Sequence, residues 1–127
     1  MALYAQTTGT HSTTSGPFVP IPGLSLTLPG GAGGSMLVIL NLPNPFAVGN
    51  NYPGATFGIS AGGVMSPVQA CFTSGEQSPS STGRVPTTLV VSIPLTDASQ
   101  TITAMWSSVR GSTVTIDTPA TLCAMFG

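Results

Sequence analysis

Short apolar or alternating segments, separated by proline and glycine, make up most of the chain. Residues 24–28, Leu-Ser-Leu-Thr-Leu, alternate strictly, which is typical of a half-buried β-strand. Residues 36–42 form an apolar run, which favours a strand buried on both faces. We expect the other strands in residues 2–5, 56–59, 68–73, 87–95, 100–106, 113–117 and 121–126.

The segments between these strands carry the residues that favour turns and loops. Residues 7–16 are rich in Thr, Ser and Gly and predict an exposed loop that contains His11, the only histidine. Further loops are expected over residues 43–54 and 74–86, and turns are expected at residues 18–23, 29–34, 62–63 and 109–112.

Helix is not expected anywhere, because no window has a helical period and Glu, Lys and Arg are scarce. Many short strands with closely spaced turns predict an all-β sandwich or barrel, best matched by a jelly roll. The length fits one domain over residues 1–127, without an internal repeat.

Charge is almost absent: charged residues make up 4% of the chain and the net charge is −1. This composition argues against nucleic acid and anionic membrane surfaces as partners, since both require many cations. The apolar runs are too short for membrane insertion. The N-terminus lacks the pattern of a signal peptide, so we expect a chain that stays in the cytoplasm, leaves by another route, or has been trimmed.

Catalytic and metal-binding patterns are missing from the sequence. The acids Glu76, Asp97 and Asp117 are widely spaced, and His11 is alone. Neither a paired-carboxylate centre nor a zinc, calcium or phosphate site is indicated. We therefore expect no enzymatic activity and no cofactor.

The two cysteines, Cys71 and Cys123, lie in strand-like segments. Two buried free thiols are the expectation. A disulfide between two strands is the alternative, because sequence does not show whether the Cα atoms are close enough.

Arg84 and Arg110 are the only cations, and each lies beside hydroxyls and a glycine, in Ser-Thr-Gly-Arg and Ser-Ser-Val-Arg-Gly. A guanidinium is a rigid fork of five donors, well suited to a neutral ligand rich in oxygen, such as a sugar. The alternative for either arginine is a structural role in which it donates to loop carbonyls.

Three aromatic side chains bear on this interpretation. Trp106 alternates with apolar residues, which favours core packing over a stacking platform. Phe46 and Tyr52 lie in a predicted loop and are better candidates for the apolar wall of a sugar site.

An ordered set of motifs extends from about Phe18 to the end of the chain. The set consists of Ile-Pro-Gly-Leu (21–24), Val-Ile-Leu-Asn (38–41), Gly-Asn-Asn-Tyr-Pro-Gly (49–54), Cys-Phe-Thr (71–73), Ser-Thr-Gly-Arg (81–84), Trp106, Ser-Val-Arg-Gly-Ser (108–112) and Ile-Asp (116–117). In this order the motifs resemble the TNF-like fucose-binding lectin family, to which the N-terminal domain of a Burkholderia superlectin belongs.

The resemblance implies a TNF-like jelly-roll β-sandwich that forms a homotrimer, with a fucoside site at each subunit interface. It places a threonine and an arginine of one subunit on Thr73 and Arg110. It places a serine, a threonine and an arginine of the neighbour on Ser81, Thr82 and Arg84.

The resemblance also implies contacts at the rim of the site, where this chain departs from the family. Asp117 falls on an aspartate that reaches the sugar beyond the fucose. Phe46, Thr56 and Ser74 replace family tyrosines, and Ser80 replaces a glutamate. These changes predict a retained pocket for fucose with an altered preference among larger oligosaccharides.

Two functions follow as hypotheses. The first is a calcium-independent lectin, without enzymatic activity, for fucosylated glycans. The alternative is a trimeric structural or adhesin head whose sugar site is lost or altered. The retention of both arginines in a chain with no other cation favours the lectin.

Overall fold

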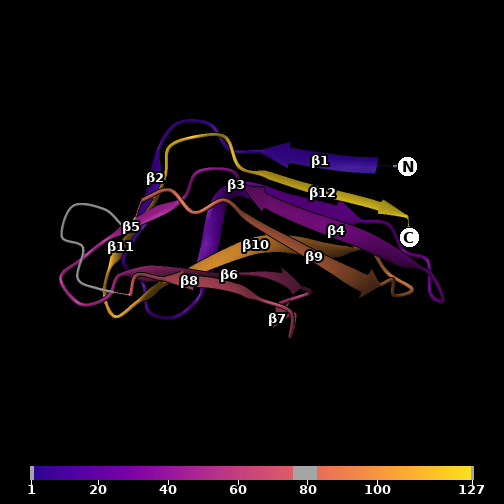
Figure 1. Ribbon diagram of the computed structural model, residues 1–127. Helices are drawn as coiled ribbons and strands as arrows, with labels where there is room; N and C mark the ends of the chain where they lie inside the picture. Colours follow the sequence, from indigo (N-terminus) through magenta and orange to yellow (C-terminus); the bar gives the residue numbers. More distant parts are fainter. Residues whose placement is uncertain (1, 76–82, 127) are drawn as a thin grey trace.

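The computed structural model describes residues 2–75 and 83–126 as two facing β-sheets with a smaller sheet at one end (Figure 1). The first sheet has the order β1 (Ala2–Gln6), β12 (Thr121–Phe126), β4 (Ser35–Leu42) and β9 (Thr87–Pro94). The second has the order β3 (Val19–Leu28), β10 (Gln100–Val109), β6 (Gly54–Ala61) and β7 (Val64–Met65), and β8 (Ala70–Thr73) also pairs with β6.

The small sheet contains β2 (His11–Thr13), β11 (Thr113–Ile116) and β5 (Phe46–Val48), in that order. It lies at the end of the sandwich opposite the two chain termini (Figure 1). The strands of all three sheets pair antiparallel. The all-β sandwich expected from the sequence is thus confirmed, and no helix long and apolar enough to cross a membrane occurs in residues 2–75 and 83–126.

The core is built by alternation along the strands. In β4 every second side chain is buried, beginning with Met36, and in β9 the same pattern buries Leu89, Val91 and Ile93. Trp106 of β10 is 1% exposed and lies opposite buried Phe57 of β6, so its predicted core position is confirmed. Burying each large side chain contributes about 1.5–3 kcal/mol.

Every strand expected from the sequence is present, although the ends differ. β3 begins at Val19, inside the predicted turn, and β10 continues to Val109. The expectation for residues 36–42 is wrong in one respect, because the outward side chains of β4 are only half-buried. The reason is that β4 belongs to an antiparallel sheet with one face on the core.

Two predicted loops contain strands. His11 lies in β2, not in an exposed loop, and residues 43–54 contain β5. Both strands pair with β11, so Ile116 lies opposite His11 and Thr115 lies opposite Phe46. These short strands depend on pairing with a distant partner, which no local alternation indicates.

The outward face of the first sheet carries an apolar row. Tyr4, Cys123, Ile39 and Val90 lie side by side across β1, β12, β4 and β9. Tyr4 is 63% exposed and Val90 is 49% exposed. We call these four residues the outer apolar row.

Both cysteines are free thiols, so the expectation of unpaired cysteines is confirmed. The expectation that both are buried is wrong: Cys71 is exposed and Cys123 is half-buried. Each cysteine lies outward because alternation along its strand turns the adjacent positions toward the core, where Phe72 is partly buried and Leu122 and Ala124 are buried.

Candidate functional site: two arginine corners

The two arginines are held near opposite ends of β11. Arg110 precedes β11 in the turn from β10, whereas Arg84 contacts Asp117, which directly follows the strand. A strand rises about 3.4 Å per residue, so Thr113 and Asp117 are roughly 14 Å apart. We call the two groups of contacts the Arg84 corner (Asn44, Phe46, Arg84, Asp117 and Thr118) and the Arg110 corner (Asn51, Tyr52 and Arg110).

In the Arg84 corner the guanidinium forms a two-point ion pair with Asp117. Nη1 donates to Oδ1 at 2.5 Å and Nη2 donates to Oδ2 at 2.9 Å. Nη1 also donates to the carbonyl of Asn44 at 3.0 Å, and the guanidinium lies 4.4 Å from the centre of the Phe46 ring. The backbone is fixed alongside, because Val85 N–H donates to the carbonyl of Pro45 at 3.0 Å.

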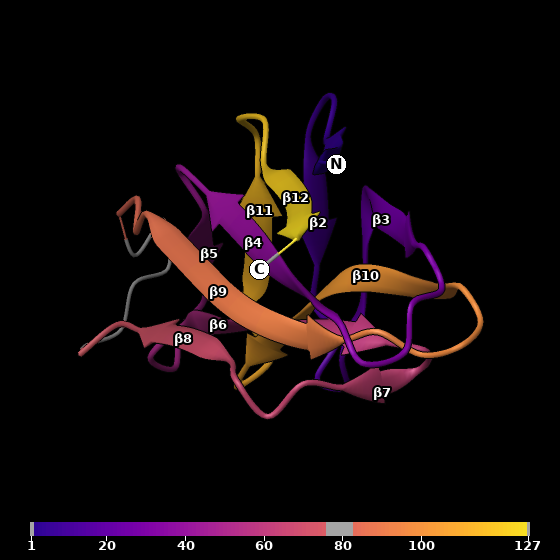
Figure 2. The same cartoon turned by 90° about the vertical axis from the view of Figure 1, so that its right-hand side faces the viewer.

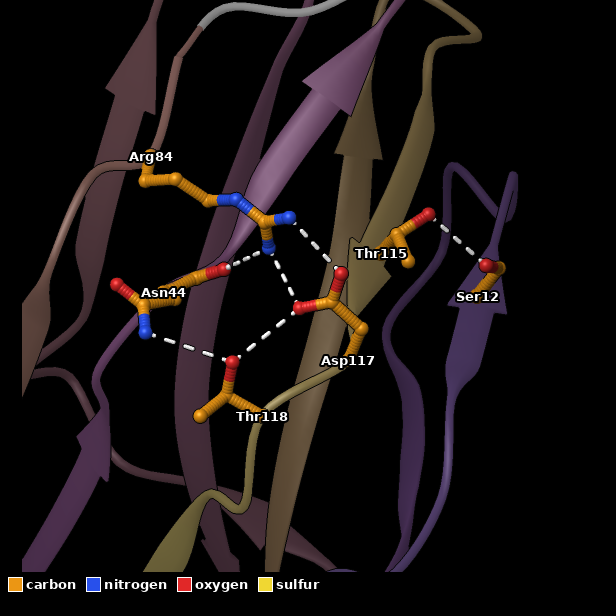
Figure 3. A network of polar contacts seen from close by, with 6 residues as sticks. All are labelled: Ser12, Asn44, Arg84, Thr115, Asp117 and Thr118. Carbon is orange, nitrogen blue, oxygen red and sulfur yellow. Dashed lines mark hydrogen bonds and ion pairs between the residues drawn. The ribbon is translucent and has the colours of Figure 1, made fainter.

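These contacts close into a ring of four residues, which Figure 3 shows from close by. The Asn44 amide donates to the Thr118 hydroxyl at 3.4 Å, and that hydroxyl donates to Asp117 Oδ1 at 3.2 Å. Asp117 and the Asn44 carbonyl then both accept from Arg84. Each member is thereby oriented by two others, so the guanidinium has a fixed direction.

The same view shows how β11 is held from its other side (Figure 3). Ser12 of β2 and Thr115 of β11 are joined by a hydrogen bond of 2.9 Å between their hydroxyls. This bond ties the strand that carries Asp117 to β2.

The ion pair shifts the ionisation of both partners. The hydrogen bond from Arg84 holds the pKa of the Asp117 carboxyl below its ordinary value, and Asp117 raises the pKa of Arg84. The side chains are 47% and 32% exposed, so water screens the attraction. The pair therefore serves mainly to fix geometry.

Two donors on one edge of the Arg84 guanidinium have no partner among the described residues. Of its five donors, two on Nη1 and one on Nη2 are engaged by Asn44 and Asp117. Within residues 2–75 and 83–126, no acceptor meets Nε–H or the second Nη2 proton. These two donors lie side by side on one edge of the planar group and can engage two ligand oxygens together.

The Arg110 corner is built on a tight turn. Arg110 and Gly111 have φ angles of 52° and 70°, and Ser112 N–H donates to the Val109 carbonyl at 3.2 Å. Positive φ at both central positions is typical of a type I′ turn, which suits glycine but is costly for arginine. The contacts of the Arg110 side chain hold this conformation.

Those contacts go to backbone carbonyls. Arg110 Nε donates to Asn51 O at 2.9 Å and to Tyr52 O at 3.1 Å, and Nη2 donates to Tyr52 O at 2.5 Å. The guanidinium lies 5.7 Å from the centre of the Tyr52 ring, and Tyr52 itself has a φ of 47°. This is the structural role considered as the alternative for either arginine, and Nη1 has no acceptor within residues 2–75 and 83–126.

Thr73 lies at the same end of the molecule as Arg110. Val109, Gly54 and Thr73 are aligned across β10, β6 and β8. Gly54 allows this close approach, because an added Cβ would lie 2.2 Å from the Phe72 carbonyl. Ser112 fixes the junction by donating to Gly54 O at 2.8 Å.

The predicted site residues thus separate into two groups. Phe46 and Asp117 join Arg84, while Thr73 lies on the side of Arg110. Ser74 follows Thr73 directly, and Thr56 lies on β6 between Cys71 and Ser107. The expectations for Ser81 and Thr82 lie outside the described residues.

Asn44 and Thr118 were missed by the sequence analysis. They are 74 residues apart, and only the fold brings them together. Polar residues beside proline, in Pro-Asn-Pro and Asp-Thr-Pro, were the one available signal, and they indicate turns without indicating partners.

A pocket lies away from both corners, and the described residues offer no metal site. A pocket of about 240 Å³, lined by Met65, Ile93 and Gln100 among others, opens between β7 and β9. Figure 2 shows β7 beside the C-terminal end of β9, whereas Arg84 precedes the other end of that strand. The described residues contain no group of three His, Cys, Asp or Glu side chains that could hold a metal ion.

Comparison with known proteins identifies one family. The model of the family described as "Bc2l-C, N-terminal domain" matches residues 4–125. A search of curated proteins found no match. Among solved structures, the CBM36-1 domain of a multidomain xylanase from the hindgut metagenome of Trinervitermes trinervoides is 15% identical, with a TM-score of 0.49, over 98% of this chain and 97% of that one.

Proposed function

We propose that this chain is a non-catalytic lectin for fucosylated glycans. The premise is its family: the chain belongs to the family of Bc2l-C N-terminal domains. The site requires no metal ion and is shared between adjacent subunits of a homotrimer. The observation that carries the proposal is the separation of the two arginines, each with its own group of polar residues, at opposite ends of β11.

Each corner supplies half of a sugar site. The Arg110 corner offers the Nη1 donors with Thr73 on a neighbouring strand, and the Arg84 corner offers the open edge of the second fork. Sugar hydroxyls both donate and accept, so guanidinium and threonine groups are suitable partners. Because β11 (Thr113–Ile116) separates the two halves, apposition of two subunits explains a composite site better than one chain does.

Apolar surface supports the assembly. The outer apolar row exposes Tyr4 and Val90 on the outward face of the first sheet. In a cyclic trimer, each subunit presents two different surfaces to its neighbours, so an Arg110 corner can face an Arg84 corner at every interface.

One observation favours the second candidate, a structural head without a working sugar site. Both forks already have partners in their own chain, and those of Arg110 are backbone carbonyls. The open donors that remain on each fork favour the lectin.

Calorimetric titration of the trimer with methyl fucoside, with and without EDTA, tests the proposal. We expect binding that chelation leaves unchanged, because the ligand is neutral and the described residues contain no metal-binding cluster. A glycan array then compares methyl fucoside with fucosylated tri- and tetrasaccharides, since Phe46, Thr56 and Ser74 are expected to shift that preference. Silence toward all of them contradicts the lectin and supports the structural head. Loss of binding in EDTA contradicts a metal-independent site.

A further inference from the structure

We propose that Asp117 is a positioning residue, which holds Arg84 so that its Nε–Nη2 edge faces two adjacent hydroxyl oxygens of a sugar ring. Thr118 supports this arrangement by donating a hydrogen bond to Asp117, and Asn44 in turn donates to Thr118. The inference rests on the proposed lectin function and assigns a part of the site that the resemblance does not: there, Asp117 reaches a second sugar.

The carboxylate is committed to the ring of four residues. Oδ1 accepts from Arg84 and from Thr118, and Oδ2 accepts from the other terminal nitrogen of Arg84. Both oxygens point at the fork, as Figure 3 shows. A carboxylate held in this way orients its partner and has little capacity left for a sugar hydroxyl.

The Arg84 guanidinium cannot rotate without breaking several contacts. Rotation about the Nε–Cζ bond breaks both bonds to Asp117 and the bond to Asn44, and tilting moves the guanidinium off the Phe46 ring. Before a ligand arrives, the open edge therefore has one direction. Preorganisation of this kind raises affinity by removing the entropy cost of ordering a flexible side chain on binding.

Asp117→Asn tests the inference, because it keeps the shape and turns one acceptor into a donor that opposes Arg84. Asp97→Asn is the matched control, since it changes the net charge equally at an exposed position in the turn between β9 and β10. Thr118→Val is the second variant, which removes the support of Asp117 and leaves both charges. All variants are measured as full-length trimers against methyl fucoside and against deoxy analogues that lack one of two adjacent hydroxyls.

We expect Asp117→Asn to weaken methyl fucoside binding about tenfold, the effect of one charge-assisted hydrogen bond. The loss should shrink for the deoxy analogue that has already lost the oxygen facing Arg84. Asp97→Asn should bind as the unchanged protein does, and Thr118→Val should lie between the two.

Nitrogen NMR of the arginine side chains gives a readout that does not need a ligand. We expect separate Nη signals for Arg84 in the unchanged protein, caused by hindered rotation, which merge in Asp117→Asn. The signals of Arg110, which has other partners, should stay as they are and show that the fold is intact.

The outcomes separate the inference from the proposed function. Unchanged fucoside affinity in Asp117→Asn, together with weakened binding by an Arg84 variant, overturns the positioning role and leaves the lectin standing. An equal loss for methyl fucoside and for every deoxy analogue overturns it as well, because Asp117 then acts elsewhere on the sugar. Silence of the unchanged protein toward every fucoside overturns the proposed function, and with it the ligand assigned to the edge.

Discussion

The Arg84 and Arg110 corners engage different edges of the same kind of side chain. Arg110 spends its Nε edge on the carbonyls of Asn51 and Tyr52. Arg84 uses its two terminal nitrogens for Asp117 and Asn44, so its Nε edge has no partner among the described residues. Arg110 thus ties down a backbone loop, whereas Arg84 is itself held by the Asp117 carboxylate and the Asn44 carbonyl.

The difference lies in what each guanidinium supports. Arg110 and Tyr52 both have positive φ angles, and each non-glycine residue in that conformation carries a backbone cost. The carbonyl bonds of Arg110 offset this cost, so stability and binding are joined in one residue. Arg84 belongs to an exposed ion pair, which contributes little to stability, so its effect should fall on binding alone.

The largest expected effect comes from separating the two corners onto different subunits. Arg84→Ala and Arg110→Ala homotrimers should each lack fucoside binding, because every interface is missing one fork. After co-refolding, each mixed trimer has one interface at which an intact Arg110 faces an intact Arg84. Calorimetry on tagged and separated mixed trimers should show one restored site per trimer.

This complementation contradicts the shared site if mixed trimers form but stay silent. Two forks that serve one pocket within one chain cannot be restored by any combination of these two variants. Trimers refolded and separated in the same way from tagged chains without a substitution are the control for loss of binding during refolding.

The next effect sharpens the role of Arg84. Arg84→Lys keeps the charge and loses the planar edge, so fucoside affinity should fall by about 1.5–3 kcal/mol, the range for a hydrogen bond to a charged group. The melting temperature and the mass by light scattering should match those of the unchanged protein. Unaltered affinity in an intact trimer would show that Arg84 is purely structural.

A smaller effect, on stability, should come from the other corner. Arg110→Lys cannot donate to both loop carbonyls with a planar fork, so the free energy of unfolding should fall by about 1 kcal/mol. Denaturant unfolding of Arg84→Lys alongside it is the matched control. Equal stabilities of the two variants would remove the contrast drawn between the corners.

The smallest effect is the pH dependence of the Arg84 corner. The folded pKa of Asp117 is lowered from 3.8, so the contribution of the ion pair is fully present above that value. It is lost as the pH falls through the lowered pKa, where the carboxyl takes up a proton. NMR titration of Asp117 should give a midpoint below 3.8, which returns toward the ordinary value in Arg84→Ala. A midpoint unaffected by that substitution would mean that the pair does not form in solution.

Much of the fold was predictable because it follows from local alternation. Residues 24–28 and 87–95 turn every second side chain toward the core, with Leu26 half-buried, and a period of two can be recognised without knowing the partner strand. β2 and β5 could not be recognised from a period of two. Each is three residues long and exists because β11 offers a ladder on both sides, so nothing in His11–Thr13 itself distinguishes it from a loop.

By itself, the sequence determined the class of fold, the scarcity of charge and the two arginines as the candidate ligand forks. Only the tertiary structure decided which edge of each fork is engaged. The partners of Arg84 come from residues 40 and 33 positions away, and those of Arg110 from 58 and 59 positions away. A hydrogen bond depends on ångström distances between atoms, and no spacing along the chain encodes these until the sheets have folded.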